Sequence, residues 1–198
     1  MPGHEYRLAG EDKWPAQIDD VHTALAYLHH ESPSLGVDPN KIVVSGNSAG
    51  GSLALLTAGQ GEVPVAAAVA FYAPVDFLGE DARAKGAPQA MSFILGDDVS
   101  ESRLAGMSPI NYVSSAFPPT LLITGNSDDL VSSGESLRMY QALIAAPASA
   151  ELHIFDGAPH AFDLLPDFGR QCANIVSLFL DTHVLNSRSL VLPREPDE

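Results

Sequence analysis

Residues 41–56 read KIVVSGNSAGGSLALL, an apolar run followed by a glycine-rich turn and a segment of small and apolar residues. This order predicts a buried strand, a tight turn and a helix, with Ser48 at the turn. We expect Gly46 and Gly50 to remove the side chains that would otherwise collide across so sharp a bend. Ser48 would then project alone above the end of a sheet.

The backbone around Ser48 is suited to a nucleophile. The N–H group of Ala49 is expected at the helix N-terminus, where unpaired amides and the helix dipole stabilise a developing negative charge. Asn47 and Gly50, on either side of this pair, are candidate substrate-binding residues. The Gly-x-Ser-x-Gly pattern alone is weak evidence, and a glycine-rich loop of purely structural use is the alternative. The strand before it and the helix after it favour the nucleophile.

The composition of the chain limits the classes of function. Its 198 residues are enough for one domain with a continuous core. The formal net charge is −15 with only 10 Lys and Arg, which argues against nucleic-acid binding because phosphate recognition needs clustered cations. Cys172 is the only cysteine and lies in an apolar helical setting, so we expect a buried thiol and no internal disulfide.

The sequence predicts neither a membrane span nor a secretory signal in its first residues. No apolar run reaches the length of a membrane span, and residues 1–6 lack a basic segment followed by an apolar stretch. A cytoplasmic location is therefore the default expectation. Residues 186–198 combine charge with two prolines, which predicts a loosely attached tail beyond a single domain at 1–185.

Strands and helices alternate along most of the chain. Apolar residues recur at helical spacing, and four buried strands are expected, with the helix at 15–31 and the strands at 41–45, 66–72, 120–124 and 151–155. Ser132 and Glu135 have the spacing of a capping box, which predicts that another helix begins there. This alternation predicts an α/β fold, with a mostly parallel sheet flanked by helices on both faces.

Residues 77–118 break this alternation. The stretch is rich in Ala, Gly, Ser and Pro, and it contains only short apolar groups. It follows the C-terminal end of a predicted strand, the edge at which open parallel sheets bind ligands. The stretch is therefore either a small cap or one wall of a pocket, or an ordinary long connection.

A nucleophilic serine needs a base, and the base needs a third group that fixes its tautomer. His160 follows the fourth predicted strand in a Gly-Ala-Pro-His turn and is the candidate base, with a surface loop histidine as the alternative. Asp128, after the third strand, is the candidate acid, and Asp129 and Asp76 are the other candidates. Each of these aspartates could instead bond nearby backbone amides in a turn.

The other histidines give no convincing metal site. His22 and His29 lie seven residues apart on the first predicted helix. No Asp or Cys completes a ligand set at a matching spacing, so we expect neither a metal nor any other cofactor.

Five segments resemble successive motifs of the α/β-hydrolases, specifically the carboxylesterases related to hormone-sensitive lipase and to microbial acetyl and feruloyl esterases. The segments are YRLA at 6–9, PAQIDD at 15–20, GNSAGG at 46–51, GNSD at 125–128 and GAPH at 157–160. Their order and spacing agree with the family over most of the chain. The resemblance implies an α/β-hydrolase fold in which Ser48 is the nucleophile, Asp128 the acid and His160 the base. Ala49 would donate one oxyanion-hole N–H.

The chain departs from the family at its N-terminal end. The family normally has a further part there, which holds the first strands of the sheet and a His-Gly-Gly loop that donates the other oxyanion amides. Gly3 and Gly10 are the only glycines before residue 36, and neither belongs to such a run. We therefore expect a reduced sheet with its first strands missing and one edge open. Such an edge pairs with other chains, which predicts a homo-oligomer or a placement of residues 1–14 against it.

These observations predict a serine esterase that hydrolyses small, short-acyl carboxylic esters through an acyl-enzyme. One alternative is a truncated, inactive relative that acts by binding, because losing an oxyanion donor typically costs about a hundredfold to a thousandfold in turnover. The second is a serine peptidase of the prolyl-oligopeptidase type, whose residue after the serine is usually aromatic. Ala49 favours the esterase. The expected ligand is a small ester, with no role for nucleic acid or membrane.

Overall fold

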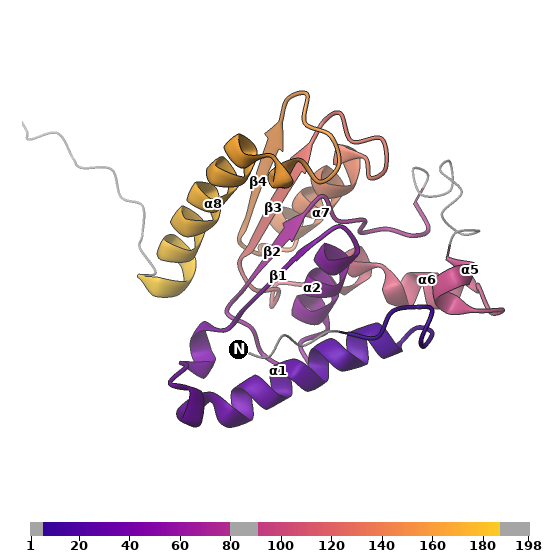
Figure 1. Cartoon of the computed structure of the whole chain (residues 1–198), viewed down its shortest axis with the longest axis horizontal. Coiled ribbons are helices and arrows are strands. Elements are labelled where there is room, and N and C mark those ends of the chain that lie inside the picture. Colours follow the sequence, from indigo (N-terminus) through magenta and orange to yellow (C-terminus); the bar gives the residue numbers. More distant parts are fainter. Residues whose placement is uncertain (1–5, 80–90, 187–198) are drawn as a thin grey trace, which may run out of the picture.

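A four-stranded parallel sheet forms the centre of the computed structural model, which describes residues 6–79 and 91–186. The strand order is β1-β2-β3-β4, and every neighbouring pair is parallel (Figure 1). The strands are β1 (Val43–Asn47), β2 (Ala67–Phe71), β3 (Thr120–Gly125) and β4 (Ala150–Phe155). Each overlaps one of the predicted strands, which confirms the expected α/β fold class.

Helices cover both faces of this sheet (Figure 1). α2 and α7 pack on one face and α8 on the other, while α1 packs on the outer side of α2. The helices are α1 (Ala16–Leu35), α2 (Ala49–Gln60), α5 (Ser92–Leu95), α6 (Glu101–Met107), α7 (Ser133–Ala145) and α8 (Pro166–Leu180). Shorter helical segments are η1 (Pro39–Lys41), η2 (Pro109–Tyr112), η3 (Phe162–Leu164) and η4 (Asp181–Leu185).

The alternation of side chains along β2 explains the two cores. Ala68 and Ala70 face α2 and α7, whereas Val69 and Phe71 face α8. All five residues of β2 are buried, as expected for a central parallel strand with helices on both sides. Cys172 of α8 lies in the second core and is buried, as predicted, and this burial raises the pKa of its thiol.

The segment after β2 builds a smaller cluster beside the sheet. α5 and α6 lie to the right in Figure 1, and Phe77, Leu95, Leu104 and Met107 form a separate apolar core there, with Trp14 packed against it. Residues 80–90 of this segment, and residues 187–198 of the expected tail, lie outside the described residues.

β1 forms one edge of the sheet. It pairs with β2, and in the described ranges 6–79 and 91–186 no strand pairs with its other side. Its burial is also incomplete, whereas β2 and β3 are buried throughout. The expected open edge is therefore present in the part of the chain that the structure describes.

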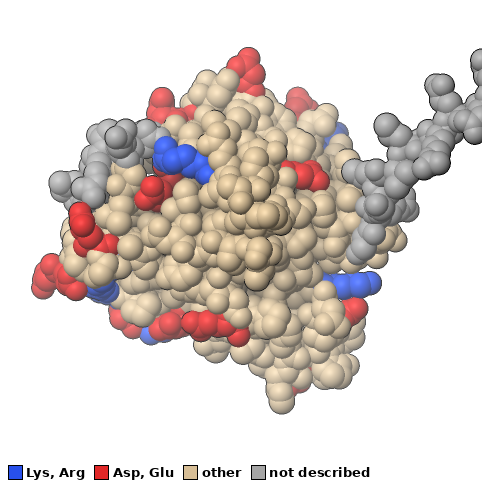
Figure 2. All heavy atoms as spheres, turned by 180° about the vertical axis from the view of Figure 1, so that it is seen from behind, with Lys and Arg blue, Asp and Glu red and all other residues tan. Residues whose placement is uncertain are grey.

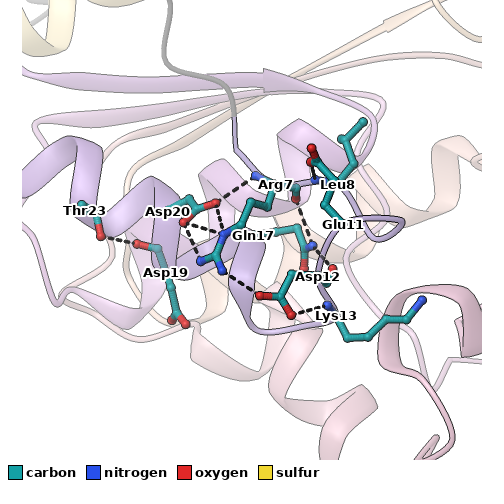
Figure 3. A network of polar contacts seen from close by, with 9 residues as sticks. All are labelled: Arg7, Leu8, Glu11, Asp12, Lys13, Gln17, Asp19, Asp20 and Thr23. Carbon is teal, nitrogen blue, oxygen red and sulfur yellow. Dashed lines mark hydrogen bonds and ion pairs between the residues drawn. The ribbon is translucent and has the colours of Figure 1, made fainter.

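The described part of the N-terminal segment, from residue 6 onward, is bonded to α1, and no bond from it to the β1 edge is found (Figure 3). The Arg7 guanidinium donates to both carboxylate oxygens of Asp20 and to Asp12, and its backbone N–H donates to Asp20 as well. The Gln17 amide donates to the carbonyl groups of Arg7 and Asp12. Hydrogen bonding to Arg7 lowers the pKa of the Asp20 carboxyl to about 2. Residues 1–5 lie outside the described residues.

The surface is predominantly acidic, since 25 Asp and Glu stand against 10 Lys and Arg. Figure 2 shows that the basic side chains of the described residues stand at separate places on one face of the molecule and form no patch on that face. Within residues 6–79 and 91–186, none of the helices combines the length and the apolar character that a membrane span requires.

Candidate active site

Ser48 occupies a strained turn between β1 and α2. Its backbone has φ 53° and ψ −120°, a conformation that non-glycine residues rarely adopt. The Ser48 N–H donates to the Phe71 carbonyl at 2.9 Å, and the Ser52 N–H donates to the Ser48 carbonyl at 3.1 Å. These bonds hold the turn between β2 and the first turn of α2, so that the Ser48 side chain lies at the C-terminal edge of the sheet.

Two glycines allow the turn to close, but one is not the residue expected. A Cβ atom on Gly46 would lie 2.2 Å from the Gly50 carbonyl oxygen, and one on Gly51 would lie 2.8 Å from the Ala73 Cβ. A Cβ on Gly50 would meet open space, so the steric role predicted for Gly50 is wrong. The Gly50 carbonyl is the group that packs against Gly46, whereas a side chain on Gly50 would point away from this close approach.

Ser48, His160 and Asp128 form a continuous line of polar contacts. The Ser48 Oγ lies 3.1 Å from His160 Nε2, and His160 Nδ1 lies 2.7 Å from Asp128 Oδ2. A carboxylate accepts only, so Nδ1 carries a proton, and the neutral ring then presents Nε2 as an acceptor toward the serine hydroxyl. This is the geometry in which an imidazole can remove the serine proton.

Asp128 is the one of the three candidate acids whose carboxylate bonds to His160. Its side chain is 0% exposed, and its other oxygen accepts from the N–H groups of Leu130 and Val131 at 2.9 and 2.8 Å. These bonds fix the direction of the carboxylate. Asp76 lies after β2, where its Oδ1 accepts from the Leu78 N–H at 3.0 Å.

The loops after β3 and β4 are bonded to each other, which brings Asp128 and His160 together. The Asn126 side chain accepts from the Gly157 N–H at 2.7 Å and donates to Asp156 at 2.8 Å. The Ser127 N–H donates to the Ala158 carbonyl at 3.1 Å. The sequence does not show that these two loops pair, because their pairing depends on β3 and β4 being neighbours in the sheet.

A pocket of about 580 Å³ opens beside Ser48. Its walls are mostly apolar and come from the N-terminal segment, α1, α2, the 77–118 stretch and the start of α7. Lining residues within 77–118 are Phe77, Met91, Phe93, Ile94 and Met107. The volume lies in the range of small-molecule sites in proteins.

Ala49, but neither Asn47 nor Gly50, joins Ser48 in the pocket lining. Ala49 is the first residue of α2, so its amide has no acceptor within the helix and remains available to an oxyanion. The Asn47 amide donates instead to the Tyr72 hydroxyl at 2.7 Å and to Asp163 at 2.8 Å.

The Tyr72 hydroxyl, which accepts from Asn47, lies in a buried setting. This burial is the main cause that raises the pKa of Tyr72 to about 12.

Glu135 has a role that the sequence did not predict. Ser132 caps α7 by accepting from the Gly134 N–H at 3.2 Å, as expected. The carboxylate of Glu135, however, accepts from the N–H groups of Val75 and Asp76 at 2.9 and 3.0 Å, so the expected capping box is only half formed. The amides of the loop after β2 attract the carboxylate, and no local pattern signals so distant a partner.

The two α1 histidines that were considered as a metal pair each have a different neighbour. His22 Nδ1 lies 3.2 Å from Glu62, and His29 Nε2 lies 2.8 Å from the Pro64 carbonyl. Among the described residues, no group of three or more His, Cys, Asp and Glu side chains is arranged to hold a metal ion.

Comparison with known proteins connects this geometry to a family. A model of the BD-FAE family matches residues 3–143 of the chain. An AB hydrolase superfamily protein of Schizosaccharomyces pombe, C1039.03, is 31% identical, over 84% of this chain and 55% of its own length. Esterase LipC of Mycobacterium tuberculosis is 32% identical, over 89% of this chain and 49% of its own length. The chain thus spans about half the length of these curated relatives.

A solved structure shares the arrangement in three dimensions. The acetyl ester-xyloside bifunctional hydrolase from Caldicellulosiruptor lactoaceticus superposes with a TM-score of 0.79 and 26% sequence identity. The match covers 90% of this chain and 69% of that chain. Most of the described fold therefore has a counterpart in a larger hydrolase.

Proposed function

Because the chain belongs to the BD-FAE family of α/β-hydrolases, we propose that it hydrolyses carboxylic esters, with Ser48 as the nucleophile. His160 is the proposed general base and Asp128 the acid that orients it. The observation that carries this proposal is the line of contacts from Ser48 Oγ through His160 to Asp128, at 3.1 and 2.7 Å, beside an apolar pocket.

The reaction follows from the positions of these groups. Ser48 Oγ attacks the carbonyl carbon of the ester while His160 Nε2 takes the hydroxyl proton. The bond to the alcohol oxygen then breaks, and His160 returns the proton to the departing alcohol. In the second step a water molecule, deprotonated by His160, attacks the acyl carbon and Ser48 leaves with the proton. Asp128 stabilises the imidazolium that forms in both steps.

The Ala49 amide is the proposed donor to the oxyanion. It lies at the N-terminus of α2, where the helix dipole also favours negative charge. A single donor supports slower turnover than a complete oxyanion hole, which is the basis of the alternative that the chain acts by binding alone.

Short-acyl esters remain the proposed substrates. LipC is named an esterase, and the Caldicellulosiruptor protein is described as acting on an acetyl ester. The pocket of about 580 Å³ is larger than an acetyl or butyryl group needs, so a series of acyl lengths is the direct test.

The deciding experiment is hydrolysis of p-nitrophenyl acetate, butyrate and octanoate by the purified chain and by Ser48→Ala. Ser45→Ala, a change of an exposed serine on β1, is the matched control. The proposal expects turnover that is highest on acetate or butyrate, survives in Ser45→Ala and disappears in Ser48→Ala. Turnover that is absent from the folded wild-type chain, or equal in Ser48→Ala, favours the binding protein. Cleavage of peptide p-nitroanilides in preference to esters favours the peptidase.

The open edge of β1 supports a second part of the proposal. Unpaired strand edges join other strands through backbone hydrogen bonds, and β1 has no neighbour on that side among the described residues. We propose that a second copy of the chain pairs there. Light scattering during size-exclusion chromatography tests this, and a monomer at concentrations of roughly 100 µM, far above the micromolar range of moderate association, would contradict it.

A further inference from the structure

Three polar side chains form a network beside the proposed triad. The Tyr72 hydroxyl donates to Asp163 Oδ1 at 2.5 Å, and the Asn47 amide donates to the same hydroxyl at 2.7 Å and to Asp163 Oδ2 at 2.8 Å. We propose that Asn47, Tyr72 and Asp163 are positioning residues that hold His160 at its distance from Ser48. This inference rests on the proposed function.

The network joins the two chain segments that supply the nucleophile and the base. Asn47, the last residue of β1, precedes Ser48 in the sequence, and Asp163 lies three residues after His160. Tyr72 follows the end of β2, between them in the sheet. A shift of either segment would therefore stretch hydrogen bonds to Tyr72, so the network resists changes in the 3.1 Å contact from Ser48 to His160.

The Tyr72 ring also limits the rotation of His160. The two rings meet edge to face, with centroids 4.6 Å apart and planes at 61°. Tyr72 is buried, and its ring is in turn packed against Phe162, which is 0% exposed. The backbone of Tyr72 has φ 37°, in the left-handed region that non-glycine residues rarely occupy. Its N–H donates to the Ile123 carbonyl at 2.7 Å, which holds this uncommon conformation in place.

The Tyr72 hydroxyl keeps its proton in neutral solution. Burial raises the pKa of Tyr72 to about 12, so its hydroxyl remains a donor to Asp163 in neutral solution. None of the three residues lines the pocket. The network should therefore affect the rate of the chemical step and leave substrate binding nearly unchanged.

The test measures kcat and KM on p-nitrophenyl acetate for Asn47→Ala, Tyr72→Phe, Asp163→Asn and Asp163→Ala. Asp167→Ala, which removes a fully exposed carboxylate on α8, is the matched control. Each network variant is expected to lower kcat by roughly tenfold with KM within about twofold, because small displacements of a catalytic group are costly. Asp163→Asn keeps an acceptor oxygen and should recover part of the loss seen in Asp163→Ala.

Thermal unfolding separates this role from a general loss of structure. Asn47 is exposed, so Asn47→Ala should keep its unfolding midpoint while kcat falls. The rate at which a fluorophosphonate labels Ser48, followed by intact mass, should fall in parallel, since it depends on the same Ser48–His160 contact.

Two results would overturn the inference, and they differ from failure of the proposed function. An active wild-type chain with unchanged kcat and labelling in Asn47→Ala and Tyr72→Phe rejects the network alone. An equal loss of kcat in Asp163→Ala and Asp163→Asn, with a lower unfolding midpoint in both, also rejects the inference, because Asp163 would then have a structural role only. A wild-type chain that neither turns over esters nor labels at Ser48 rejects the proposed function and this inference together.

Discussion

The carboxylate of Glu135 accepts a hydrogen bond of 2.9 Å from the backbone amide of Val75, across 60 residues of sequence. The bond joins the first turn of α7 to the loop that follows β2. Glu135 also lines the pocket, as do Pro74 and Asp76 of the loop after β2. The bond therefore holds this part of the pocket wall against α7, the helix that follows the Asp128 loop. Its second oxygen is paired with Arg138.

Replacing Glu135 should destabilise the fold. Glu135→Ala leaves two amides without their acceptor, one of them buried, and we expect the free energy of unfolding to fall by about 3 kcal/mol. Glu135→Gln keeps one acceptor oxygen and should lose less. Urea unfolding measures both, with Glu62→Ala as the exposed control. Equal stability of Glu135→Ala and Glu62→Ala would show that the bonds to the loop contribute nothing.

The glycines of the turn provide a matched pair of variants. Gly46→Ala places a Cβ about 2.2 Å from the Gly50 carbonyl oxygen, so we expect it to open the turn and to lower the unfolding midpoint strongly. Gly50→Ala enters open space in the first turn of α2 and should be neutral, or stabilising by up to ~1 kcal/mol. Thermal unfolding followed by circular dichroism decides between them. A midpoint that falls equally in both variants would contradict the steric account.

The identity of the acid can be tested by three amide substitutions. Asp128→Asn removes the carboxylate that accepts from His160 and should lower kcat by about a thousandfold or more, as the wrong tautomer is then favoured. Asp129→Asn should stay within a few-fold of wild type. Asp76→Asn changes the pocket wall and should act mainly on KM. Steady-state kinetics on one ester is sufficient. A thousandfold loss of kcat in Asp129→Asn, but not in Asp128→Asn, would identify Asp129 as the acid.

The ion pair between Arg7 and Asp20 predicts a specific dependence of stability on pH. The pKa of Asp20 is lowered to about 2 in the folded chain, below its ordinary value of about 3.9, so its ionised form favours the folded state. This contribution is present above about pH 4 and is lost as the pH falls toward 2.

Urea unfolding of wild type and Asp20→Asn measures the effect. The difference in stability between them should be constant between about pH 5 and 7 and should narrow below about pH 4. It should also shrink in about 1 M salt, because the pair is near the surface. Asp167→Asn, whose pair with Arg170 is longer at 3.5 Å, is the control. A difference that does not change with pH would mean that Asp20 acts through packing instead.

Much of the fold follows from local sequence. β2 and β3 were predicted because fully buried parallel strands are continuous apolar runs, and the Ser48 turn because glycine is required where backbone segments cross closely. Gly50 was misjudged because a local pattern cannot show which of three neighbouring glycines faces the crossing. The partner of Glu135 was missed for a related reason, since a helix-capping pattern contains no information about a loop from another part of the chain.

Outside residues 77–118, the sequence by itself determined the strands, the main helices and their order, because strand, turn and helix signals act over a few residues. It also placed Ser48, Asp128 and His160 after three different strands, where a parallel sheet brings them to one edge. Only the tertiary structure decided the contacts between them: which aspartate reaches His160, and that Asn47 turns toward Tyr72 and Asp163. These contacts join residues far apart in the chain, and their distances are set by sheet order and loop pairing, which no local pattern encodes.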